Sequence, residues 1–127
     1  MTAAPVVSSR ALAVEAARAA SAKQARDVVV MEMRDLLVIT DYFVVAGGTS
    51  DRQVRTVAEE IERALRERGV KPVRREGERE GRWVLLDYVD LVVHVFLDEE
   101  REFYDLERLW ADAPRVGWEH AGAVSNG

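Results

Sequence analysis

Residues 83–110 read WVLLDYVDLVVHVFLDEEREFYDLERLW, and this stretch decides the fold more than any other part of the chain. Two apolar runs, residues 83–87 and 91–97, flank a short turn, which predicts two adjacent strands. The charged segment that follows carries spaced apolar residues and predicts a helix. The stretch holds most of the large aromatic residues but few side chains suited to catalysis, so it indicates a protein that binds rather than one that reacts.

The register of this hairpin sorts its side chains into two faces. If Tyr88 and Val89 form a two-residue turn, the predicted pairs are Trp83 with His94, Leu85 with Val92, and Asp87 with Asp90. One face is then wholly aliphatic and should hold the sheet to its helices: Val84, Leu86, Leu91, Val93 and Val95. The other face also includes Phe96, and we predict that it binds a partner through Trp83, Leu85, Asp87, Asp90, Val92 and His94. A one-residue slip would mix the two sets, which favours this register.

The polar residues of the hairpin have two interpretations each. A catalytic His94 would need a nucleophile or an orienting acid within reach, and Asp87 and Asp90 lie further along, toward the turn. We favour a partly buried histidine packed against Trp83. The two aspartates could hold a metal or act in acid–base chemistry, but aspartates beside a tight turn more often bond to its backbone, and we favour that role.

The rest of the chain supplies elements that surround this hairpin. Alanine-rich spacing predicts a helix over residues 9–22, and apolar runs at 28–33 and 42–46 predict strands. Ser50 and Gln53 form a capping signature for a helix that ends at Gly69, and residues 70–75 predict a short edge strand. Asp98 should cap the last helix, whose apolar stripe is Phe103, Leu106, Leu109 and Trp110. This order predicts an α/β fold with a mixed five-stranded sheet flanked by helices.

Composition limits the classes of protein to which the chain can belong. The chain has 127 residues, which suits one domain, and it lacks cysteine, which excludes disulfides and thiolate metal sites. It shows neither a signal sequence nor an apolar run of the roughly 18 residues needed to cross a bilayer, so we expect a cytoplasmic protein without membrane contact. We divide it into a flexible N-terminus (residues 1–8), one domain (9–111) and a disordered C-terminal tail (112–127).

Residues 47–50, Gly-Gly-Thr-Ser, precede a predicted helix and are a candidate phosphate site. Free amides and the helix dipole would both point at a bound anion there. The residues match neither of the common glycine-rich phosphate motifs. We therefore favour a strand exit followed by a helix cap.

A group of basic residues near the third strand is a candidate RNA contact: Lys71, Arg74, Arg75, Arg79 and Arg82. Glu76, Glu78 and Glu80 alternate with them, and the formal net charge of the chain is -5, so the overall field repels nucleic acid. We favour a solvated loop over an RNA-binding patch.

Three blocks of sequence resemble the ribosomal silencing factor family, also called the Iojap-like family. They are TDYFVVAGGTSDRQV (residues 40–54), REGEREGRWVLLDY (75–88) and DLVVHVFLDEEREFYDLERLW (90–110). The resemblance covers nearly everything from the first helix to Trp110, in the order and spacing of the family. One departure is local: many members have glycine where this chain has Val89, and a β-branched residue poorly fits a turn that needs positive φ.

The resemblance implies a cytoplasmic factor that binds the large ribosomal subunit through its universal protein number fourteen. A factor bound there blocks joining of the small subunit, and translation slows when nutrients are short. The resemblance also implies a homodimer when the protein is free. From the residues themselves we expect no cofactor and at most a minor contact with ribosomal RNA.

The family fold is similar to that of nucleotidyltransferases. The acidic pair that those enzymes carry on the strand after the next helix is missing here, where residues 70–75 read VKPVRR. We therefore expect no enzymatic activity. The alternative is a degenerate nucleotide-binding enzyme that uses residues 47–50.

Overall fold

The computed structural model describes residues 8–37 and 39–119. Its elements in chain order are α1 (Ser9–Ala22), β1 (Arg26–Glu32), β2 (Tyr42–Gly48), α2 (Asp51–Glu67), β3 (Arg74–Glu76), β4 (Trp83–Asp87), β5 (Leu91–Leu97), α3 (Asp98–Tyr104) and α4 (Leu106–Leu109). Among the described residues the strands form one five-stranded sheet. The predicted fold class, an α/β domain with a mixed five-stranded sheet, is confirmed.

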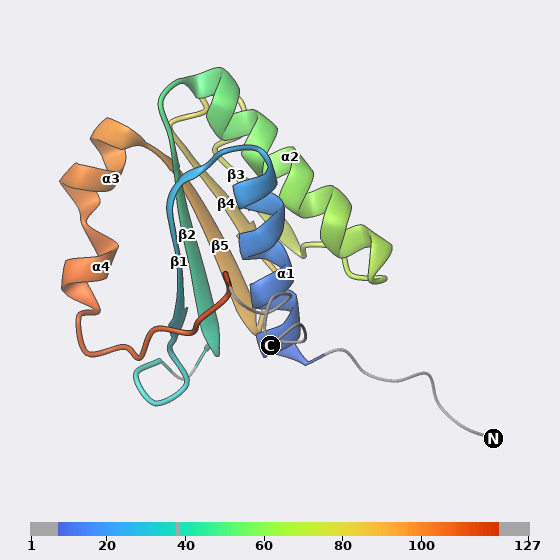
Figure 1. Ribbon diagram of the computed structural model, residues 1–127, viewed down its shortest axis with the longest axis vertical. Helices are drawn as coiled ribbons and strands as arrows, with labels where there is room; N and C mark the ends of the chain where they lie inside the picture. Colours follow the sequence, from blue (N-terminus) through green and yellow to red (C-terminus); the bar gives the residue numbers. More distant parts are fainter. Residues whose placement is uncertain (1–7, 38, 120–127) are drawn as a thin grey trace.

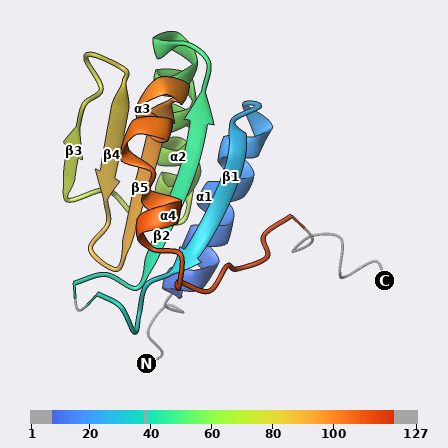
Figure 2. The ribbon, with the colours of Figure 1, turned by 90° about the vertical axis from the view of Figure 1, so that its left-hand side faces the viewer.

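The sheet has one covered face and one partly open face. Its strand order is β1-β2-β5-β4-β3, with β2 and β5 parallel and the other neighbours antiparallel. Helices α1 and α2 cover one face, as Figure 1 shows. Figure 2 shows the opposite face, where α3 and α4 lie in front of β2 and β5 and leave β3 and β4 uncovered. The hairpin of β4 and β5 therefore contributes to a closed core on one side and to an accessible surface on the other.

The covered face holds the main hydrophobic core. The small alanines of α1 allow that helix to approach the sheet closely, and the aliphatic stripe of α2 packs beside it. The predicted aliphatic face of the hairpin is part of this core: Val84, Leu86, Leu91, Val93 and Val95 are at most 1% exposed. Each such side chain contributes about 1.5–3 kcal/mol by leaving water.

The hairpin turn lies one residue later than predicted. Tyr88 N–H donates to the Leu91 carbonyl at 2.8 Å, so Val89 and Asp90 form the turn. Observed pairs are Trp83 with Phe96, Leu85 with His94, and Asp87 with Val92, which makes the predicted register wrong by two residues. The cause is that Val89 adopts φ +75° despite its β-branch, while Asp87 Oδ1 accepts a hydrogen bond from Val89 N–H at 2.8 Å. Because side chains alternate with period two, this error leaves every strand residue on its predicted face and moves only Asp90 into the turn.

The last predicted helix is broken into α3 and α4 at Asp105, which has φ +47°. Asp98 is the first helical residue and not the cap, a position that Leu97 takes. The break redirects the apolar residues: Phe103 is 79% and Leu109 is 67% exposed, whereas Leu106 and Trp110 pack against the sheet. The prediction of one continuous helix with a single apolar stripe is therefore wrong.

Residues 112–119, the first part of the predicted tail, follow the edge of the sheet in the structure. They run along β1, where Pro114 accepts a hydrogen bond from Glu32 N–H at 2.8 Å and Val116 N–H donates to Val30 at 2.9 Å. The indole N–H of Trp118 donates to the Val28 carbonyl at 3.0 Å. This segment protects the β1 edge of the sheet. The remaining predicted tail, residues 120–127, and residues 1–7 of the predicted flexible N-terminus lie outside the described residues.

Candidate partner-binding face

The partly open sheet face carries five of the six residues predicted to bind a partner. Trp83, Leu85 and Asp87 alternate along β4 and are each partly exposed, and Val92 on β5 lies opposite Asp87. His94 lies opposite Leu85 and is buried, with 5% exposure. Asp90 is exposed in the turn at the end of this face and does not pair with Asp87.

Trp83 is held on three sides. Its indole stacks on Phe96 with ring centroids 4.8 Å apart, and it meets Tyr104 at the end of α3 at 4.6 Å. Its N–H donates to His94 Nδ1 at 3.1 Å. Since Trp83 is still partly exposed, the face presents a large aromatic side chain whose orientation is already fixed.

His94 packs against Trp83, as the favoured interpretation of the sequence has it, but it is buried rather than partly buried. The Phe43 ring meets it edge-on at 4.6 Å, and the Phe96 ring lies roughly parallel to it at 6.0 Å. Burial lowers the pKa of His94 to about 4, so the imidazole is neutral at physiological pH. Its ring packs against Phe43, Trp83 and Phe96, and its Nδ1 accepts from an indole N–H rather than bonding to an orienting acid or a nucleophile, as a catalytic histidine would.

Asp87 has the predicted role in the turn. One carboxylate oxygen accepts from Val89 N–H, and the other lies 3.6 Å from Arg74 Nη2. Within residues 8–37 and 39–119, no group of three or more His, Asp or Glu side chains is arranged to hold a metal ion.

The sequence interpretation missed an aromatic extension of this face. Tyr104, which the sequence did not single out, is 46% exposed and contacts Trp83, and Phe103, which the sequence placed in an apolar stripe, is 79% exposed and contacts Tyr104. The available signal was Asp105, because aspartate tolerates the left-handed backbone conformation that ends α3. Residues 98–109 contain six acidic and two basic residues, a net charge of -4 out of -5 for the chain, so this extension is strongly acidic.

The family model described as "Ribosomal silencing factor during starvation" matches residues 6–126. The chain belongs to the ribosomal silencing factor family. A ribosomal silencing factor of Halalkalibacterium halodurans is 43% identical over 98 residues, which cover 77% of this chain and 82% of that protein. A crystal structure of a Chromobacterium violaceum protein gives a TM-score of 0.80 at 34% identity, covering 83% of this chain and 88% of that one. A mouse protein named mitochondrial assembly of ribosomal large subunit protein 1 is 34% identical over 87 residues, 66% of this chain and 38% of its own length.

In this member of the ribosomal silencing factor family, packing accounts for the glycines at residues 47–50. A Cβ on Gly48 would lie 3.0 Å from Val54 Cγ2, and one on Gly47 would lie 3.1 Å from Arg101 Nη1. Two of the amides beyond them are already bonded: Thr49 N–H donates to Gln53 Oε1 at 2.8 Å, and Gln53 N–H donates to Ser50 Oγ at 3.1 Å. The favoured interpretation, a strand exit and helix cap, accounts for these contacts without a phosphate.

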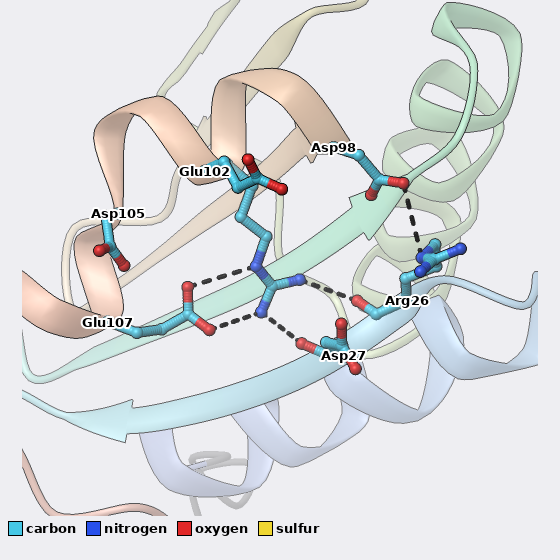
Figure 3. Close-up of a pocket in the computed structure, with 7 residues that line it drawn as sticks. Arg26, Asp27, Asp98, Glu102, Asp105 and Glu107 are labelled. Atoms are coloured by element: carbon cyan, nitrogen blue, oxygen red, sulfur yellow. Dashed lines mark hydrogen bonds and ion pairs between the residues drawn. The ribbon is translucent and has the colours of Figure 1, made fainter.

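A polar hollow of about 300 Å³ lies between β1 and the helices α3 and α4. Figure 3 shows Glu107 on one side of it and Arg26 and Asp27 of β1 on the other. Arg101 fills the space between them: its guanidinium donates to both oxygens of Glu107, at 3.2 and 2.8 Å, and to the carbonyls of Arg26 and Asp27. These hydrogen bonds of Arg101, which we call the clamp at Arg101, therefore hold α3 and α4 against the sheet.

No helix within the described ranges is both long and apolar enough to span a membrane.

Proposed function

We propose that this chain binds the large ribosomal subunit through its protein number fourteen and that its bulk blocks joining of the small subunit. Translation would then slow when nutrients are short. The family description, which names silencing during starvation, supports this role, and the name of the mouse relative refers to the large subunit. Steric blocking needs a complementary surface and no chemical turnover.

We place the contact on the face of Trp83, Leu85, Asp87, Asp90, Val92 and His94, with Phe103 and Tyr104 at its rim. The observation that carries this assignment is the fixed, partly exposed indole of Trp83 on an otherwise uncovered part of the sheet. Interfaces take most of their energy from a few aromatic anchors, and an interface of ordinary size removes about 800 Å² per partner from water. Loss of such an anchor costs about 2 kcal/mol, or roughly thirtyfold in affinity.

Charge favours a protein partner over RNA at this face. The acidic helices α3 and α4 would repel phosphates and attract a basic protein surface. The candidate RNA-binding arginines are partly neutralised: Arg74 lies 3.2 Å from Glu76, and Arg75 lies 2.8 Å from Glu62 and 3.4 Å from Glu78. Any contact with ribosomal RNA is therefore a minor one in this proposal.

We also propose that the free protein is a homodimer that uses the same face. The exposed Phe103 and Leu109 give the face an apolar rim that a second copy would cover. The ribosome and the second copy would then compete for it. Sedimentation equilibrium of the free protein, with and without Phe103→Ala, tests this: a monomer at all concentrations contradicts the proposal.

Sedimentation of separated ribosomal subunits with the purified protein tests the main proposal. The wild-type chain should migrate with the large subunit and reduce the amount of joined ribosomes. Trp83→Ala and Phe103→Ala should weaken both effects, and Arg52→Ala, on the exposed surface of α2, is the matched control. Thermal unfolding of each variant separates loss of contact from loss of fold. Wild-type binding by both folded aromatic variants would refute the placement of the contact, and unaltered joining with wild-type protein would refute the function.

A further inference from the structure

His94 occupies a position at which packing alone favours an apolar residue. It interrupts the strand Leu91–Leu97, whose other residues are all apolar, and it is 5% exposed. Its Nε2 is buried and has no hydrogen-bond partner within the described part of the chain. A buried polar atom left without a partner lowers stability. The unpaired Nε2 therefore lowers the free energy of unfolding. The favourable hydrogen bond of the imidazole is made by its other nitrogen, Nδ1.

The contribution of Nδ1 is to accept the indole N–H of Trp83, at 3.1 Å. This bond requires an unprotonated Nδ1, so the proton of the neutral ring lies on Nε2. The imidazole is itself held by the edge of Phe43 and the face of Phe96. Because stacking on Phe96 and the tilted contact with Tyr104 fix the plane of the indole, and the hydrogen bond fixes its direction within that plane, the side chain has one orientation.

We propose that His94 is a positioning residue that sets the orientation of Trp83 for the docking partner. This inference rests on the proposed function of the face. A partner that meets a mobile tryptophan must immobilise it, whereas a preset indole has lost that freedom on folding. Preorganisation of one large side chain changes affinity by about three- to tenfold. His94 therefore increases affinity without contacting the partner through its buried ring.

Two substitutions separate positioning from packing. His94→Phe keeps a ring but removes the acceptor, and His94→Asn places an amide oxygen near the position of Nδ1 but leaves a smaller side chain. We expect the Phe variant to be at least as stable as the wild type and to bind the large subunit about three- to tenfold more weakly. We expect the Asn variant to be less stable and to bind more tightly than the Phe variant. If the affinity for the large subunit rises and falls with the unfolding free energy across the wild type, His94→Phe and His94→Asn, the inference is overturned.

The free protein provides a readout that does not depend on the ribosome. The indole N–H resonance of Trp83, assigned by its loss in Trp83→Phe, should shift upfield and exchange faster with solvent in His94→Phe, and should stay near its wild-type position in His94→Asn. An unchanged resonance in His94→Phe overturns the inference, whatever affinity the variants have for the large subunit.

A double-mutant cycle tests whether His94 acts through Trp83. In a Trp83→Phe background, which lacks the N–H, His94→Phe should cause no further loss of affinity for the subunit. Additive losses would overturn the inference while leaving the docking face in place. If Trp83→Ala itself binds as the wild type does, the proposed face fails and the inference fails with it.

Discussion

A shift from pH 7 to pH 5 should destabilise this protein through His94, because folding forces that imidazole to stay neutral. Burial among aromatic rings lowers its pKa from 6.5 to about 4. The unfolded chain then binds a proton more readily than the folded one, so the stability that the neutral ring contributes is present above pH 6.5 and is lost as the pH falls toward 4. With these two pKa values, linkage gives a loss of about 2 kcal/mol between pH 7 and pH 5 and about 3 kcal/mol in all.

Urea unfolding at half-unit steps of pH measures this loss. Carboxylates also titrate toward the acid end, so the informative quantity is the difference in unfolding free energy between the wild type and His94→Phe. That difference should move by about 2 kcal/mol in favour of the variant between pH 7 and pH 5. Parallel stability curves for the two proteins over this range would show that the imidazole is not held neutral, and the argument from burial would be wrong.

Three further substitutions test local features of the fold. Val89→Gly should raise the unfolding free energy by about 0.5–1 kcal/mol in urea unfolding, because it relieves the positive φ of +75°. Gly47→Ala should lower it by about 1–3 kcal/mol, because the new methyl group would meet Arg101 Nη1 at 3.1 Å and that guanidinium is held by its own hydrogen bonds. Trp118→Ala should speed proteolytic cleavage after residue 112, because the segment loses its bond to Val28; unchanged digestion would contradict the docking of that segment on β1.

The faces of the hairpin could be predicted from the sequence although its register could not. The clean separation of the two faces favoured a turn at Tyr88 and Val89, but the chain turns at Val89 and Asp90, where the Asp87 carboxylate accepts from the Val89 amide. Moving the turn by one residue moves each cross-strand partner by two, and two is the period of a strand. The set of strand residues on each face depends on that period alone, so the error in pairing changed the position of Asp90 and of no other predicted site residue.

The features that the sequence did not predict depend on contacts between residues that are distant in sequence. Helical periodicity continues through residues 98–110, and Asp105, which tolerates a left-handed conformation, is the one local sign of a break; that it takes this conformation goes with the hydrogen bonds of Arg101 to β1. The segment after residue 112 lacks periodicity because it pairs with an edge strand through backbone atoms. Backbone pairing of this kind leaves little trace in side-chain patterns. The exposure of Phe103 follows from the helix break at Asp105, so the sequence did not predict that exposure either.

The clamp at Arg101 connects these distant features to the proposed docking face. Arg101 and Tyr104 lie within the same short helix: the first fastens that helix to the beginning of β1, and the second packs against Trp83. A seven-residue helix has little stability of its own, so its position depends on this clamp. The orientation of Trp83 therefore depends on Arg101 as well as on His94. Within this arrangement, a substitution at β1 that displaced the guanidinium would weaken docking without touching the face itself.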